Sequence, residues 1–267
     1  MNLTPEKKSS IERSLYPILE FDSTREAIIE PSKLLKKLDI AEYCVICYFQ
    51  DVITNVVQKC DARKVHVIRS EIGEHPIYEL DYHGVRVAFL HPCIGAPLAA
   101  GFLEELIVYG CNRFIVCGGA GVLNSEIAVG HLIVPDKALR DEGTSYHYLS
   151  PSRFVNANPK AVKVIETVLT SHNVHYVKGT TWTTDAYYRE TPGKVKLRRD
   201  EGCIVVEMEA AAYFAVSEFR GVLLGQILYA GDDVGSEEWS SRDWISRTSV
   251  REKLFWLSVE SCTQLDK

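Results

Sequence analysis

The 267-residue sequence predicts a single α/β domain with a central mixed, mostly parallel sheet flanked by helices. Short apolar runs alternate with amphipathic segments, which is the pattern of a layered α/β fold. Several of these runs, such as residues 222–229, are almost continuously apolar, as expected of strands covered on both faces. No linker-like stretch interrupts the pattern after residue 40. We therefore expect an N-terminal extension, residues 1–40, packed on one domain of residues 41–267.

Turn and cap residues mark the boundaries of the predicted elements. Pro97 suits the first turn of a helix, Gly110 suits its end, and residues 82–84 suit a hairpin turn. From Met208 apolar residues recur at helical spacing, and Gly221 suits a left-handed cap. The predicted elements in chain order are helix 31–38, strand 43–49, helix 51–59, strands 64–69, 77–82 and 85–91, helix 97–109, strands 114–117 and 132–135, helix 161–172, strand 174–181, helix 194–201, strand 204–206, helix 208–220, strand 222–229 and a closing helix from about residue 239 to residue 261.

Composition and charge exclude several classes of function. The formal charge is −6 and the basic residues are scattered, so we expect no nucleic-acid partner. The first residues lack the apolar core of a signal peptide, and no apolar run approaches the ~18 residues of a membrane-spanning helix. Most of the eight cysteines lie in or beside apolar runs, which suits small buried hydrophobes better than disulfides or metal ligands. These features indicate a cytoplasmic protein without a metal site or membrane partner.

A glycine-rich segment, Gly118-Gly119-Ala120-Gly121, follows the strand predicted at residues 114–117. It lacks the complete G-x-G-x-x-G pattern, and no helix opens directly after it, so we expect no dinucleotide cofactor. The glycines instead suit a tight turn or the close approach of a small ligand to backbone amides.

Carboxylates gather where predicted strands end. Glu207 and Glu209 follow the strand at residues 204–206, and Asp232 follows the strand at residues 222–229. Structural roles are available, since an acid at a helix N-terminus is favourable by about 0.3–1 kcal/mol. However, ligands of open α/β sheets bind at the carboxyl ends of strands. There, one carboxylate can accept hydrogen bonds from two vicinal hydroxyls, and a second, protonated carboxyl can act as a general acid.

Four segments make the chain resemble the nucleoside phosphorylase superfamily, which includes uridine phosphorylase, purine nucleoside phosphorylase and methylthioadenosine nucleosidase. The resemblance covers roughly residues 41–260 and depends most on the E-M-E-A-x-A pattern. The segments are VEMEAAA at 206–212, GAPLAAGFLEEL at 95–106, GGAGVL to VGHLIVPDKA within 118–138, and TTDAYY at 183–188. It implies cleavage of the N-ribosyl bond of a nucleoside by a homodimer or hexamer.

The resemblance also implies roles for individual residues. Met208 and Glu209 would contact the ribose, and Asp232 would protonate N7 of a departing purine. The Tyr187 ring would pack on the base, and nearby Arg189 could equally read a pyrimidine. Glu207 and Gly95 are further expected substrate-binding residues, and the expected pocket for the ribosyl acceptor is formed by Gly118, Gly119 and Ala120.

The resemblance leaves the acceptor open between phosphate and water. The family's phosphate loop, P-G-D-x-x-R, is replaced by residues 47–52, which contain neither glycine nor arginine. Val116 and Ala120 stand where the family has an arginine and a Thr or Ser, although a dianion needs charge-assisted donors. The family favours phosphorolysis with phosphate as co-substrate and no other cofactor. Asp51 lies within a position of the acid that activates water in the nucleosidases, so hydrolysis is the alternative, and a non-catalytic nucleoside-binding relative is the third.

Overall fold

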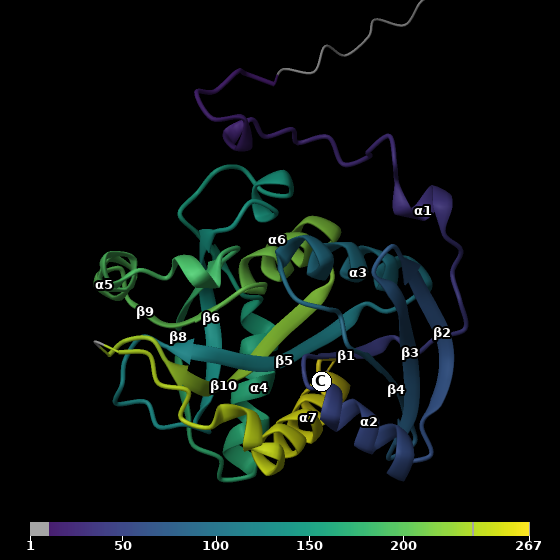
Figure 1. Ribbon diagram of the computed structural model, residues 1–267. Helices are drawn as coiled ribbons and strands as arrows, with labels where there is room; N and C mark the ends of the chain where they lie inside the picture. Colours follow the sequence, from purple (N-terminus) through teal and green to yellow (C-terminus); the bar gives the residue numbers. More distant parts are fainter. Residues whose placement is uncertain (1–10, 237, 267) are drawn as a thin grey trace, which may run out of the picture.

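A mixed sheet of ten strands forms the centre of the protein in the computed structural model, which describes residues 11–236 and 238–266 (Figure 1). The α/β prediction is confirmed. The strand order is β10-β6-β8-β9-β5-β1-β4-β3-β2, with β7 paired to β6. The strands are β1 (Tyr43–Cys47), β2 (Arg63–Ser70), β3 (Gly73–Tyr82), β4 (Val85–Leu90), β5 (Arg113–Val122), β6 (Leu132–Asp141), β7 (Phe154–Asn156), β8 (Tyr176–Thr184), β9 (Cys203–Glu207) and β10 (Leu223–Asp233).

The sheet closes on itself at one end. Strand β5 pairs with both β9 and β10, so β5, β10, β6, β8 and β9 form a ring, from which β1, β4, β3 and β2 extend. In the described residues the pairs β1–β4, β1–β5, β5–β10, β6–β8 and β8–β9 are parallel, and the other five, β2–β3, β3–β4, β5–β9, β6–β7 and β6–β10, are antiparallel. Half of these ten strand pairs are antiparallel, whereas the sequence predicted a mostly parallel sheet.

Helices cover the sheet in two groups. One group contains α3 and α6, which pack against each other, and the other contains α2, α4 and α7 (Figure 1). No helix of the described residues is long and apolar enough to cross a membrane. The helices are α1 (Pro31–Leu34), α2 (Gln50–Lys59), α3 (Ala96–Tyr109), α4 (Pro159–Ser171), α5 (Pro192–Asp200), α6 (Ala210–Arg220) and α7 (Thr248–Thr263), with 3₁₀ turns η1 (Pro17–Leu19), η2 (Ser145–His147), η3 (Tyr187–Arg189) and η4 (Trp244–Ser246).

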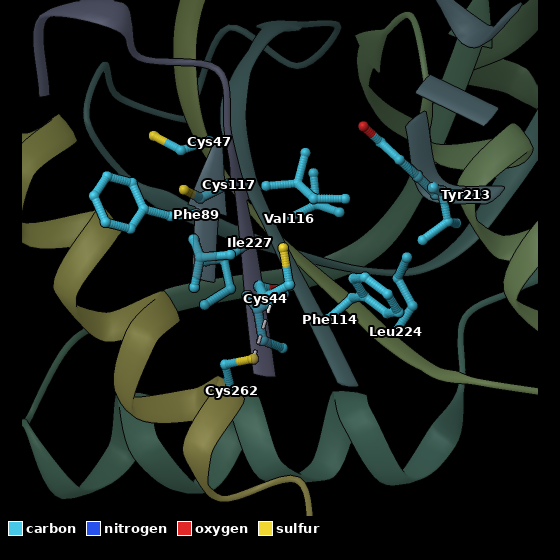
Figure 2. Packing of buried hydrophobic residues seen from close by; sticks show 14 of the residues in the cluster. Cys44, Cys47, Phe89, Phe114, Val116, Cys117, Tyr213, Leu224, Ile227 and Cys262 are labelled. Carbon is cyan, nitrogen blue, oxygen red and sulfur yellow. Dashed lines mark hydrogen bonds between the residues drawn. The ribbon is translucent and has the colours of Figure 1, made fainter. Parts of the chain in front are cut away.

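The core lies where β1 and β5 are covered on both faces. Phe89, Phe114 and Ile227 are fully buried there together with several cysteines (Figure 2). All eight cysteines are free, and those of the core contribute as small apolar side chains. Burial of both faces explains why the strand sequences are almost continuously apolar.

Several predicted boundaries were wrong. Strand β6 runs to Asp141 rather than residue 135, β10 runs to Asp233 rather than residue 229, and β3 begins at Gly73 rather than residue 77. Three further differences concern β5, α1 and the closing helix. Strand β5 does not end before the glycines but continues through them to Val122, because β10 pairs with it along this stretch. Helix α1 ends at Leu34 rather than at residue 38. The closing helix begins at Thr248 rather than near residue 239, because Ser240 pairs with Asp233 and the left-handed backbone of Arg242 and Asp243 interrupts a helix.

The N-terminal extension is joined to α6 by an ion-pair network. Arg220, in the last turn of α6, contacts Glu104 of α3 at 2.7 Å and Glu30 of the extension at 3.1 Å. Both carboxylates are buried and the Arg220 side chain is 20% exposed. Arg25 of the extension also donates to the carbonyl of Phe219. This network holds the described part of the extension, residues 11–40, on the domain.

We expect Arg220→Ala to lower the free energy of unfolding by about 3 kcal/mol, because it leaves two buried carboxylates without their cation. Urea unfolding followed by circular dichroism measures the loss. The double variant Arg220→Ala with Glu104→Gln removes one uncompensated charge and should recover part of it. An equal loss in both variants would contradict this explanation.

Candidate active site

One interruption of the sheet lies in β5. Strand β10 follows one side of β5 from Arg113 to Ala120. On the other side β1 pairs only as far as Cys117, and β9 begins at Gly121. The three residues 118–120 therefore have no strand on this side. The ends of β1 and β9 face each other across this gap, at the edge where ligands of α/β sheets bind.

Gly119 directs its backbone polar groups into the gap. Backbone groups of every second residue point to the same side of a strand. The Cys117 carbonyl accepts from Tyr48 N and the Leu123 amide donates to Ile204 O, both on this side. Gly119 and Gly121 are the second residues in turn between Cys117 and Leu123. The N–H and C=O of Gly119 therefore point to the same side as those of Cys117 and Leu123, which is the side of the gap. Gly119 is half-buried, and a ligand in the gap can accept from its N–H.

Glu209 lies at the end of the gap that β9 forms. It is the N-cap residue of α6, one position before the helix begins, and its side chain is buried. One oxygen, Oε1, accepts a 2.7 Å hydrogen bond from the amide of Gly95, which precedes α3. Met208 beside it is half-buried. Burial, and after it the charge of Glu207, raises the pKa of Glu209 to about 8. The structure thus brings Met208, Glu209 and Gly95 together.

Glu207 holds the start of α6, and with it Glu209, in position. Its Oε2 accepts from the amides of Glu209 and Ala210 at 2.7 and 2.6 Å, and its Oε1 accepts from the hydroxyls of Thr183 and Thr181 at 2.7 and 3.3 Å. Burial raises its pKa, and these donors oppose the rise. Because both oxygens are occupied by protein donors, we assign Glu207 the role of positioning the start of α6 rather than the expected contact with substrate.

The substitution Thr183→Val tests this support. Thr183 Oγ1 donates to Glu207 and accepts from the Ala211 amide at 3.0 Å, so valine leaves two buried groups without partners. We expect the free energy of unfolding to fall by about 2 kcal/mol, and substrate KM to rise because Glu209 is displaced. The matched control is Thr184→Val, whose hydroxyl accepts a 3.3 Å bond from Ala186 outside the site. Equal effects of the two substitutions would contradict the assignment.

Two tyrosines close the other end of the gap. The ring of Tyr48, directly after β1, lies 3.4 Å from where a Cβ on Gly118 would be. Its hydroxyl is 2.9 Å from the hydroxyl of Tyr213, which is fully buried in α6. For both phenols burial raises the pKa well above the ordinary value, and the nearby charge of Glu209 adds to this rise. Both tyrosines therefore remain neutral beside Glu209.

Asp232 approaches β5 from the β10 side. Its Oδ1 lies 3.4 Å from where a Cβ on Gly121 would be, and its Oδ2 accepts a 2.8 Å bond from Trp239 Nε1. Burial, and then the charge of Asp232, raises the pKa of Glu190 to about 7. Asp232 and Glu209 therefore flank β5 from its two neighbouring strands, with Glu190 as a second carboxyl near Asp232.

Asp51, the expected water-activating acid, is ion-paired in the structure. It lies 2.8 Å from Arg251 of α7, whose guanidinium lies 4.8 Å from the centre of the Phe49 ring. Phe49 packs on Tyr229, which contacts Gly119, whereas Tyr48 contacts Gly118. Successive strand residues face opposite sides of a sheet. Asp51 therefore lies beside Phe49 and Tyr229, on the side away from Tyr48, which is also the side on which Asp232 meets Gly121.

The remaining predicted residues have distinct positions. Tyr187 and Arg189 are exposed on η3, in the loop that carries Glu190 towards Asp232. Gly118 and Gly119 are covered on opposite faces by Tyr48 and Tyr229, and Ala120 is buried within the ring of strands. The sequence argument missed Tyr48, Tyr213, Thr183 and Glu190. For Thr183 the available signal was its place at the start of the TTDAYY segment, residues 183–188.

A large cavity of about 860 Å³ lies elsewhere, between the N-terminal extension and helices α3 and α6. Arg25, Pro97, Tyr148 and Phe219 are among the residues that line it. None of the predicted site residues does. We therefore place the active site at the gap in β5.

Comparisons with known proteins identify the family of the chain. A family model described as "Phosphorylase superfamily" matches residues 42–253. The chain is 27% identical over 214 residues to the guanosine phosphorylase of Halorubrum lacusprofundi, covering 78% of this chain and 88% of that protein. It is 29% identical over 206 residues to the uridine phosphorylase of Thermococcus kodakarensis, covering 69% and 74%.

Two solved structures share the fold. The uridine phosphorylase of Vibrio fischeri superposes with a TM-score of 0.71 at 23% identity, covering 85% of this chain and 93% of that one. The purine nucleoside phosphorylase of Toxoplasma gondii in complex with immucillin-H superposes with a TM-score of 0.75 at 19% identity, covering 85% and 92%. These similarities establish the architecture.

Proposed function

Because the chain belongs to the phosphorylase superfamily and is an enzyme of the nucleoside phosphorylase type, we propose that it cleaves the N-ribosyl bond of a nucleoside and releases the free base. One observation supports this most strongly. The Glu209 carboxylate is fixed by the Gly95 amide and the Glu207 support at the edge of the gap in β5. A rigid, buried acceptor in this position suits the vicinal hydroxyls of a ribose.

The two carboxylates suit the charges that develop in this reaction. As the N-ribosyl bond breaks, the sugar gains positive charge and the base gains negative charge. Glu209 holds the ribose and favours the cationic sugar, and Asp232 donates a proton to the departing base. Protonation of a base nitrogen by a carboxyl favours a purine with N7 directed at Asp232. Tyr187 and Arg189 are then expected to cover the base when their loop closes over it.

The acceptor of the ribosyl group has two candidates. Phosphate follows from the family relationship and would yield ribose 1-phosphate. Water is favoured by one observation, which is that the side chains against Gly118 and Gly119 are those of Tyr48 and Tyr229. A phosphate dianion is usually held by charge-assisted donors such as arginine, and tyrosine supplies none.

A nucleoside panel tests the proposed function. The full-length protein is incubated with purine and pyrimidine nucleosides, with and without phosphate, and release of free base is followed by chromatography. We expect release from purine nucleosides. If no nucleoside releases base in either condition, while the protein remains folded by circular dichroism, the proposed function is wrong.

A further inference from the structure

The Tyr48–Tyr213 pair has an unused hydrogen-bond donor at the gap in β5. Two hydroxyls joined by one hydrogen bond use only one of their two hydrogens, so one O–H remains for a third group. Within the described residues neither hydroxyl makes a second hydrogen bond. Gly119 directs its N–H into the same gap, as the alternation along β5 requires. The gap is thus equipped with neutral donors, one from a phenol and one from the backbone.

The same surroundings oppose a doubly charged ligand. The Tyr48 ring occupies the space against Gly118, at the 3.4 Å that ordinary van der Waals contact allows. Glu209 and Glu207 are buried carboxyl groups whose ionised forms act on Tyr48, so negative charge in this region adds to the cost of a dianion. Arg251 of α7 is already paired with Asp51 at 2.8 Å. Burying a dianion without charged donors is strongly unfavourable, whereas a water molecule carries no charge to bury.

We propose that Tyr48 selects the acceptor: its ring keeps phosphate away from Gly118 and Gly119, and the Tyr48–Tyr213 hydroxyl pair positions a water molecule. This inference rests on the proposed N-ribosyl cleavage and specifies its acceptor. The water oxygen forms the new bond to C1′ of the ribose, and the C1′–N bond breaks with its electron pair remaining on the base. Asp232 protonates the base, the attacking water releases its proton to solvent, and Asp232 regains a proton from solvent. The products are free base and ribose.

Three variants separate the two functions of Tyr48. Tyr48→Phe keeps the ring and removes the hydroxyl. Tyr48→Arg removes the ring from Gly118 and supplies a charge-assisted donor for a phosphate dianion. Tyr213→Phe is the matched control, because it breaks the same 2.9 Å hydrogen bond without changing the side chain on Gly118. Base release is measured across a phosphate titration, and ribose is distinguished from ribose 1-phosphate by chromatography. Binding of inorganic phosphate alone is measured by calorimetry.

We expect the wild-type protein to release base at the same rate with and without phosphate, to form ribose, and to show no phosphate binding. Tyr48→Phe should slow release about 10-fold, the effect of one lost hydrogen bond to an ordered water, and Tyr213→Phe should slow it less. Tyr48→Arg should bind phosphate and form some ribose 1-phosphate, because its guanidinium supplies the charged donor that the wild-type pocket lacks.

Formation of ribose 1-phosphate by the wild-type protein would overturn the proposal, whichever variants fold. So would Tyr48→Arg protein that folds but binds phosphate no better than the wild type. If no variant releases base, the proposed function fails, and the calorimetric comparison still decides whether the Tyr48 ring excludes phosphate.

Discussion

Asp232→Asn is expected to lower kcat by about 100-fold or more on purine nucleosides, because general acid catalysis typically contributes 10²–10⁴ in rate. Asparagine has the same shape and can still accept the 2.8 Å hydrogen bond from Trp239, so the fold should remain intact. It cannot give a proton to the base. Steady-state kinetics with a purine nucleoside measures the loss, and thermal unfolding verifies that stability is retained.

The neighbouring acid supplies the control for Asp232. Asp233 is buried and accepts hydrogen bonds from Ser125, Gly235 and Ser236, so its role is to shape the turn after β10. Asp233→Asn should lower stability by about 1–2 kcal/mol and change kcat little. Unchanged turnover in Asp232→Asn, or an equal loss in both variants, would remove Asp232 as the proton donor.

The affinity for nucleosides is expected to increase as pH rises from 7 to 9. The pKa of Glu209 is about 8, raised by burial and by Glu207, and only the ionised carboxylate accepts hydrogen bonds from two ribose hydroxyls. The ionised fraction rises about 10-fold across this range, so KM should fall by a similar factor. Stability moves in the opposite direction. Glu209 favours the folded state fully below its ordinary pKa of 4.5, and this contribution is lost as pH rises through about 8.

Glu209→Gln provides the matched variant for this pH dependence. The amide can still accept the hydrogen bond from Gly95, but it carries no charge at any pH. We expect KM to rise about 10- to 100-fold at pH 9, from the loss of charge-assisted bonds to the ribose, and the change of KM with pH to disappear. A 2′-deoxynucleoside should show a weaker pH dependence with the wild-type protein. A pH dependence that persists in Glu209→Gln would assign it to another group.

The architecture could be predicted from the sequence because its strands are buried on both faces. The apolar run within Leu223–Asp233 of β10 is typical of a buried strand. The motif that contains Met208 and Glu209 is local in sequence, and it was enough to indicate the family. Strand β5 was predicted too short because glycine is a poor strand former. Its continuation through Gly118–Gly121 depends on pairing with β10, whose sequence lies more than 100 residues away.

The parts of the site that could not be predicted are those made by distant pairs. Tyr48 and Tyr213 are separated by 165 residues, and no local pattern indicates that their hydroxyls meet. Nothing local in the sequence indicates that Asp51 is ion-paired, because its partner, Arg251, belongs to the last helix. In both cases the role of a side chain was decided by which residue the fold placed opposite it. Spacing along the chain carries no such information.

The gap in β5 has a consequence for how this enzyme can change. Residues 118–120 pair with no strand on one edge. Side chains at the ends of β1 and β9 can therefore be substituted there without breaking a hydrogen bond between strands. The closed ring and its buried core are held by other residues. Mutations that alter the acceptor therefore need not lower folding stability. A scaffold of this kind can acquire a new reaction through substitutions at two strand ends, and Tyr48 occupies one of them.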